Sequence, residues 1–139
     1  MNRYVFLSMI FILSFVTAVG AQTVRNASNA QVGKIENDGT IRSASNSTIG
    51  KIGSDGTIRN ASNSMVGKIG SDGTIRNASN TQIGKVDSDG TVRNSSNAHI
   101  GKVESDGTVR DASNAKMGSA SGVKKEWVAV FFFFDFFTN

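Results

Sequence analysis

The hydrophobic pattern of this chain is a 17-residue unit in which aliphatic residues return at three positions. In Thr57–Gly73 these positions hold Ile58, Val66 and Ile69, and most of their counterparts in the other units are also valine or isoleucine. β-Branched residues favour strands over helices, so the pattern predicts an all-β fold. The units begin at Thr23, Thr40, Thr57, Thr74 and Thr91, with a sixth, shortened copy from Thr108.

Two turn signals separate the predicted strands. Asp-Gly recurs from Asp38-Gly39 to Asp106-Gly107, and glycine accepts the positive φ that tight hairpin turns require. Asn-Ala-Ser-Asn or a close variant, as in Asn60–Asn63, forms the other connection, because asparagine and serine side chains hydrogen-bond their own backbone in turns. Each unit is therefore predicted to be a strand, a turn, a second strand and a hairpin into the next unit.

The spacing of Val66 and Ile69 does not fit a regular one-sided strand. They are three residues apart and would face opposite sides of the sheet. Either both faces are partly buried, or the glycine between them, Gly67, marks a bulge that redirects the chain. A glycine holds this place in every unit. We expect close backbone packing or a bulge here, because a phosphate-binding loop needs clustered glycines before a helix.

A single unit is too small to fold alone, because three aliphatic side chains offset only part of the entropy of ordering 17 residues. Neighbouring units must share a core, in an open stack or in a closed ring without free edges. Five units of the general form Gly-Lys-Ile-x-Ser-Asp-Gly-Thr-Ile-Arg, such as Gly67–Arg76, and the aromatic tail after Trp127 resemble the five-fold β-flower proteins, which are small secreted bacterial proteins. The resemblance implies an all-β fold of 17-residue β-hairpin repeats closed in a five-fold ring, and an exported location. It implies no activity.

The first 21 residues have the features of a secretory signal peptide. Arg3 is followed by the mostly apolar run Tyr4–Val16, and small residues end at Ala21 before a cleavage site. An uncleaved membrane anchor is the alternative, but the apolar run is short for a span. We predict a signal peptide over residues 1–21, a β-repeat domain over 22–118, and a Gly/Ser linker with an aromatic tail over 119–139. The expected location is secreted, or in the periplasm or cell envelope.

The segment from Trp127 to Phe137 is the most apolar part of the chain after the leader. Its 11 residues, with Asp135 among them, are too few for a transmembrane helix. As a short helix or strand it would complete the core of the ring, mediate self-association, or contact a membrane surface with Lys124 and Lys125 at the headgroups. Its candidate interaction residues are Trp127, Phe131 and Phe134.

The net charge of +4 is distributed along the repeats and is not gathered into one block. Apart from His99 the repeats contain no aromatic residue on which bases could stack, so we expect no nucleic-acid partner. In a ring, the repeated lysines would form one circle of charge and the repeated arginines another. These circles are candidate contacts for a glycan or an anionic ligand, the alternative being surface cations that serve solubility. The lysines are Lys34, Lys51, Lys68, Lys85 and Lys102.

The residue types that most often carry catalysis are scarce. The chain has no cysteine, and its one histidine, His99, occupies a variable position beside a turn, where we expect it to be exposed. This composition excludes disulfides and thiolate metal sites and gives no support for a Ser-His-Asp site. We therefore predict no enzymatic activity, no cofactor and no metal. The sequence favours an exported structural or interaction protein, with a symmetric glycan- or anion-binding module as the alternative.

Overall fold

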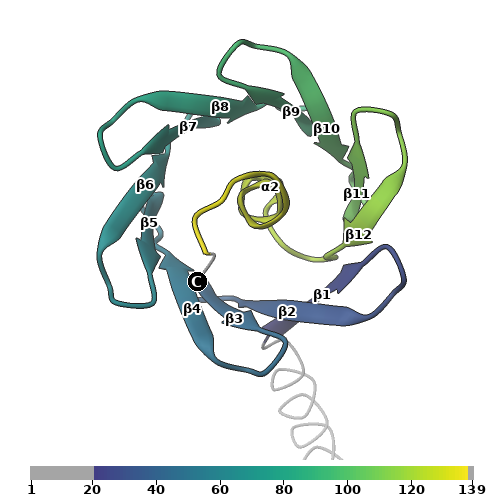
Figure 1. Cartoon of the computed structure of the whole chain (residues 1–139), viewed down its shortest axis with the longest axis horizontal. Coiled ribbons are helices and arrows are strands. Elements are labelled where there is room, and N and C mark those ends of the chain that lie inside the picture. Colours follow the sequence, from purple (N-terminus) through teal and green to yellow (C-terminus); the bar gives the residue numbers. More distant parts are fainter. Residues whose placement is uncertain (1–20, 138–139) are drawn as a thin grey trace, which may run out of the picture.

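The computed structural model describes residues 21–137 and consists of a closed ring of twelve antiparallel strands around one helix (Figure 1). Each strand pairs with its neighbours in the chain, and β1 pairs with β12 to close the barrel. The strands are β1 (Ala21–Asn26), β2 (Gln31–Glu36), β3 (Thr40–Ser43), β4 (Thr48–Ile52), β5 (Thr57–Asn60), β6 (Met65–Ile69), β7 (Thr74–Asn77), β8 (Gln82–Val86), β9 (Thr91–Asn94), β10 (His99–Val103), β11 (Thr108–Asp111) and β12 (Lys116–Ser119). Residues 1–20, which make up all but the last residue of the predicted signal peptide, lie outside this description.

The ring closes as predicted, but it contains six hairpins where the sequence analysis expected five. We call β1–β2 hairpin 1 and number the rest in chain order to β11–β12, hairpin 6. Five Asp-Gly turns are enough for six hairpins, because a linear chain needs one connection fewer than it has units. At the seam, hydrogen bonding between β1 and β12 replaces the sixth connection, with Arg25 opposite Ser119 and Asn26 opposite Gly118. The shortened last copy thus forms a complete hairpin.

Both predicted turns are confirmed. We call the connection within each hairpin, such as Asn60–Asn63, the Asn turn. In hairpin 3, the Asn60 side-chain oxygen accepts from the amides of Ser62 and Ser64, each at 3.0 Å. Asn63 ends that turn with φ of 67°, a left-handed conformation that asparagine tolerates better than most residues. In the Asp-Gly turns, Gly56 has φ of 88° and its carbonyl accepts from the Ile69 amide of the following hairpin at 2.8 Å. These turns therefore also join adjacent hairpins.

The predicted bulge is present in every hairpin. In hairpin 3, Ile58 lies opposite Gly67 while Arg59 lies opposite Met65, so Val66 is an extra residue in its strand. Two residues then oppose one partner, which redirects the chain. Val66 is half-buried against the core as a result, while Gly67 is buried. The register of the other five hairpins shifts at the same place.

The core lies inside the ring. The first and third aliphatic positions of all six units are buried, and the second positions pack against them. Helix α2 (Lys125–Phe133) runs through the middle of the ring, and Val128, Ala129 and Val130 are buried in it (Figure 1). The tail is thus helical as far as Phe133 and extended from Phe134, whose φ and ψ are −124° and 140°.

Candidate functional site

The interior of the ring is occupied by the aromatic tail. A Cβ atom built on Gly67 would lie 2.5 Å from the Phe136 ring and 2.6 Å from the Arg76 carbonyl oxygen, so only glycine leaves room for this contact. In every hairpin, one phenylalanine ring of the tail packs in this way on one glycine of the wall. The pairs are Phe131 with Gly33, Phe132 with Gly118, Phe133 with Gly101, Phe134 with Gly84, Phe136 with Gly67 and Phe137 with Gly50.

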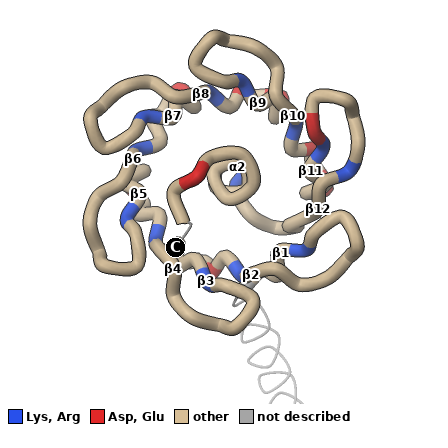
Figure 2. The backbone as a smooth tube through the Cα atoms, in the orientation of Figure 1, with Lys and Arg blue, Asp and Glu red and all other residues tan. Residues whose placement is uncertain are grey.

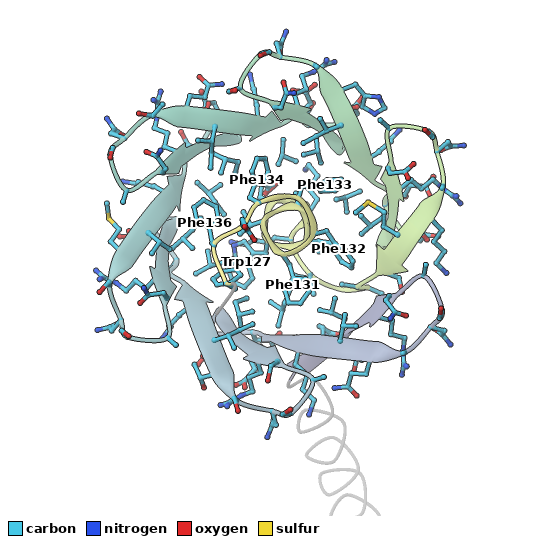
Figure 3. The ribbon with its side chains drawn as sticks, in the orientation of Figure 1. Trp127, Phe131, Phe132, Phe133, Phe134 and Phe136 are labelled. Atoms are coloured by element: carbon cyan, nitrogen blue, oxygen red, sulfur yellow. The ribbon has the colours of Figure 1, made fainter. Side chains whose placement is uncertain are left out.

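These six phenylalanines follow the ring in the direction opposite to the chain, from β2 through β12, β10, β8 and β6 to β4 (Figure 3). Asp135 has no glycine partner and is exposed. Because Phe134 is extended and side chains alternate along extended backbone, Asp135 points away from the side that carries Phe134 and Phe136. The tail therefore belongs to the core, which is the first of the three roles considered for it.

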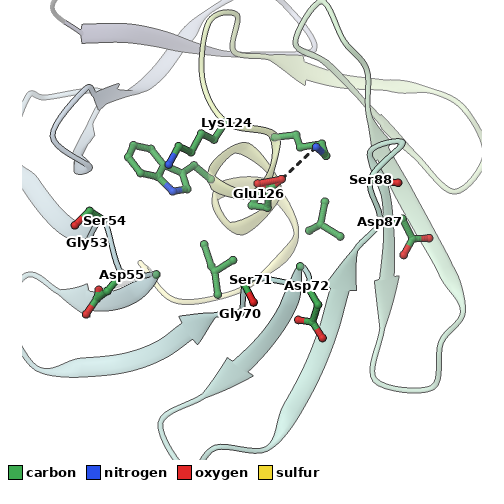
Figure 4. A pocket seen from close by; sticks show the side chains of 16 residues that line it. Gly53, Ser54, Asp55, Gly70, Ser71, Asp72, Asp87, Ser88, Lys124 and Glu126 are labelled. Carbon is green, nitrogen blue, oxygen red and sulfur yellow. Dashed lines mark ion pairs between the residues drawn. The ribbon is translucent and has the colours of Figure 1, made fainter.

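A groove of about 550 Å³ opens where α2 begins (Figure 4). Its rim is formed by successive Asp-Gly turns, Gly53–Gly56 and Gly70–Gly73, and by Asp87 and Ser88. Its other side is the start of α2 and the residue before it, 124–127. We call this feature the mouth groove.

The mouth groove combines an aromatic surface with hydroxyl groups and charges of both signs. The Lys124 ammonium lies 5.2 Å from the centre of the half-buried Trp127 ring, and Lys125 forms an ion pair with Glu126 at 3.4 Å. On the opposite rim are the exposed side chains of Ser54 and Ser71. An indole face with nearby hydroxyls and charged groups suits a small ligand that has both apolar and polar faces.

The carboxylates on the rim are held in their ionised form by the turns. The Thr57 amide donates to Asp55 at 3.0 Å and lowers the pKa of that carboxyl. The pKa of Asp72 is lowered by hydrogen bonds from Thr74, through its hydroxyl and then its amide. Both groups are therefore anionic at neutral pH and able to accept hydrogen bonds from a ligand.

The predicted circle of lysines exists on the wall and does not converge on one point. Each lysine lies opposite an arginine of the next strand, as Lys51 does opposite Arg59. Lysine and arginine are spread around the whole ring (Figure 2). Lys51, Lys68 and Lys102 are exposed, while Lys34 and Lys85 are half-buried.

The repeated arginines have a structural role that sequence reasoning missed. In every hairpin the arginine guanidinium donates to the carbonyl oxygen of the left-handed asparagine that ends the Asn turn, as Arg59 does to Asn63 at 3.1 Å. The equivalent bonds join Arg25 to Asn29, Arg42 to Asn46, Arg76 to Asn80, Arg93 to Asn97 and Arg110 to Asn114. The constant four-residue spacing from arginine to asparagine was the available signal.

The remaining candidate residues do not form one site. Phe131 and Phe134 are half-buried inside the ring, whereas Trp127 borders the mouth groove. His99 is exposed on β10, as predicted. Within residues 21–137 no three histidine, cysteine or acidic side chains are grouped to hold a metal ion. Over the same residues, α2 is too short to span a bilayer and no longer apolar helix occurs.

Comparison with known proteins gives one match. A family model described as 5-fold beta-flower protein covers residues 21–137, which include the whole ring and the tail inside it. No curated protein and no solved structure is significantly similar to the chain.

Proposed function

The chain belongs to the 5-fold β-flower family, and from this membership together with the tail-filled ring we propose an exported, non-enzymatic protein that acts as a structural or interaction module in the bacterial envelope or outside the cell. The leader-like composition of residues 1–21 supports export. The absence of cysteine from the chain agrees with a fold that needs no thiol chemistry.

The observation that carries this proposal is the filled interior. Because six phenylalanines of the tail line the inward glycines, the ring presents only its outer wall and its two ends to a partner. The wall is a closed array of short hairpins joined by turn hydrogen bonds. Such a surface suits recognition or assembly. Catalysis would instead require acid, base or nucleophilic groups that converge on one reacting atom.

Export is tested by expressing the whole chain in a bacterial host and separating cytoplasm, envelope and medium. We expect the protein in the envelope or medium, with a mass that starts at Gln22 by mass spectrometry. A matched chain lacking residues 2–21 should stay in the cytoplasm. An unprocessed chain in the cytoplasm would contradict the proposal.

Glycan binding is a second candidate function, and the mouth groove favours it. A sugar ring offers an apolar face to an indole and hydroxyls to serine and carboxylate groups, both of which border this groove beside Trp127. A glycan array probed with the chain from Gln22 tests it, using Trp127→Ala as the paired variant. We expect array signals that fall at least tenfold in the variant; signals equal for both proteins would exclude the groove.

A further inference from the structure

The outer wall contains five lysine–arginine pairs in which like charges lie directly opposite on neighbouring strands. Such pairs are unfavourable unless a counter-charge is near. In three of them a carboxylate supplies it, because the arginine Nε donates to an acid six residues earlier. These ion pairs are Arg42 with Glu36, Arg93 with Asp87 at 2.9 Å, and Arg110 with Glu104 at 3.0 Å.

The other two pairs lack that carboxylate. The position of the acid is Gly53 before Arg59 and Gly70 before Arg76. Among the described residues neither arginine has an ion-pair partner, and each forms one hydrogen bond, through its Nη1 to the Asn turn. The Nη1 bond holds the guanidinium in place, so Nε remains available where its counterparts bind a carboxylate.

The two incomplete pairs are neighbours on the ring. Lys51 and Arg59 lie on β4 and β5, and Lys68 and Arg76 lie on β6 and β7. Lys68 faces Thr57 across β5 and β6, and Arg59 is two residues farther along β5, so Lys68 is a diagonal neighbour of Arg59 on the same face. The two arginines are two strands apart and offset by two residues along the strands, because Arg76 is level with Thr57, so they lie about 12 Å apart at the usual strand spacings. The pKa values of Asp38 and Asp55 are lowered mainly by hydrogen bonds from Thr40 and Thr57, and to a smaller extent by the charges of Lys51 and Lys68. In the described structure neither lysine forms an ion pair with these acids.

We propose that the outer wall over β4–β7 binds an anionic polysaccharide. A carboxylate or sulfate oxygen on the ligand takes the place next to Arg59 Nε that Glu104 takes next to Arg110, and a second one binds at Arg76. The exposed Lys51 and Lys68 add attraction. Acidic groups that recur along a sugar chain can reach both places at once, and this divalent contact strengthens binding.

A polysaccharide fits this face better than a nucleic acid does. The strands β4–β7 carry no aromatic side chain, so unpaired bases have nothing to stack on. The hydroxyl groups of Thr48 and Thr57 lie on the same strands. The Thr48 hydroxyl accepts from Arg42 and can still donate, and the Thr57 hydroxyl donates to Asp55 and can still accept from a sugar hydroxyl. The inference rests on the proposed surface function and specifies one partner for it.

The experiment measures binding of the chain from Gln22 to immobilised heparin, a sulfated chain, and to polygalacturonate, a carboxylated chain, in low and physiological salt. The decisive variant is Gly53→Glu with Gly70→Asp, which restores the acids found in other hairpins. Since Glu36, Asp87 and Glu104 occupy the same place elsewhere, this variant should fold. We expect it to bind at least one of the two probes at least tenfold more weakly than the unaltered chain.

The matched control is Ser95→Asp with Ala112→Glu, which adds the same charge in exposed Asn turns of hairpins 5 and 6. It should bind within about twofold of the unaltered chain. A second comparison uses two double variants that each remove two lysine charges. Lys51→Gln/Lys68→Gln changes the proposed site and should weaken binding strongly, whereas Lys34→Gln/Lys102→Gln changes the wall outside it and should not.

Three results would overturn the inference. They are no binding of the unaltered chain to either polysaccharide, equal weakening by the Gly53/Gly70 variant and its control, and equally tight binding to a 20-base-pair DNA duplex. The first leaves export and the mouth groove untouched, so it does not decide the proposed function. The second would mean that the weaker binding of the Gly53/Gly70 variant comes from its net charge and not from the positions changed. The third would mean that the wall does not prefer a polysaccharide to a nucleic acid.

Discussion

The wall of the ring repeats one 17-residue pattern six times, whereas the tail inside it has no repeat and contacts all six hairpins. Each part of the wall is stabilised by nearby residues, since the turns and bulges involve residues close in sequence. The tail has local contacts within α2, but its phenylalanine rings pack on glycines that are far away in the chain. The symmetric wall therefore forms mainly from local interactions, whereas its interior is filled by one non-repeating segment whose six phenylalanines each contact a different hairpin.

The largest expected effect comes from removing the tail altogether. A chain that ends at Gly122 loses Val128, Ala129, Val130 and all six rings that line the inward glycines. We expect the ring to unfold or aggregate, because the aliphatic side chains of the wall would then border an empty interior. Circular dichroism and light scattering measure this, with Lys124→Gln/Lys125→Gln as a full-length control that should stay folded. A folded monomer without the tail would show that the wall is sufficient by itself.

A methyl group at the contact between wall and tail should be the next most damaging change. In Gly67→Ala the new Cβ meets the Phe136 ring and the Arg76 carbonyl oxygen, and the backbone oxygen has little room to move. We expect a loss of about 3 kcal/mol in the free energy of unfolding, the upper end for overpacking. Urea denaturation measures it.

Gly53→Ala is the matched control for this substitution, because its Cβ would meet only the end of the Asp55 side chain closer than 3.5 Å. It should cost clearly less than Gly67→Ala. Adding Phe136→Ala to Gly67→Ala should recover only part of the loss, since the backbone contact remains. An equal cost at both glycines would mean that the rings do not set the requirement for glycine.

Substitutions within the wall should give equal effects in equivalent hairpins. Asn60→Ala removes the acceptor of two turn amides, and Asn77→Ala removes the same two contacts in hairpin 4. Each should cost about 1 kcal/mol, because the freed amides are exposed to water. Thermal unfolding of both variants is the measurement. A difference between them larger than their common effect would mean that the hairpins are not equivalent.

Acid should weaken the wall through its Asp-Gly turns, and this is the smallest of the expected effects. The Thr91 amide donates to Asp89 at 2.9 Å and lowers the pKa of that carboxyl below its ordinary value of 3.8. A group with a lowered pKa stabilises the fold fully above its ordinary pKa, and the contribution is lost as the pH falls through the lowered one. The midpoint of thermal unfolding should therefore be constant from pH 6 to 5 and fall below pH 4.

The control for the acid effect is Asp89→Asn, which keeps an acceptor in the turn but does not titrate. Its unfolding midpoint should fall less steeply below pH 4 than that of the unaltered chain. A midpoint that already falls between pH 6 and 5 would point to other groups.

The sequence predicted what depends on neighbouring residues. Asp-Gly and Asn-Ala-Ser-Asn specify their turns through glycine φ and asparagine side chains, and the glycine beside Val66 indicated the bulge. The inward aliphatic positions followed from the same period. These features recur because each is determined within about ten residues of chain.

The number of hairpins and the position of the tail could not be predicted from local sequence patterns. Counting Asp-Gly turns gave five units, because the seam between Arg25 and Ser119 has no turn of its own. The glycine that marks the bulge also receives a phenylalanine, but no local pattern links Gly33 to Phe131, almost a hundred residues away. The free arginine Nε at Arg59 likewise became visible only beside its paired counterparts.

The one-to-one match of phenylalanines with hairpins also bears on how such chains can change in length. Tandem duplication adds whole 17-residue copies, and each new hairpin would bring an inward glycine with no aromatic ring against it. A copy gained or lost must then be accompanied by a phenylalanine gained or lost in the tail. The number of phenylalanines in the tail thus matches the number of hairpins, and the repeat region and the tail are expected to evolve together.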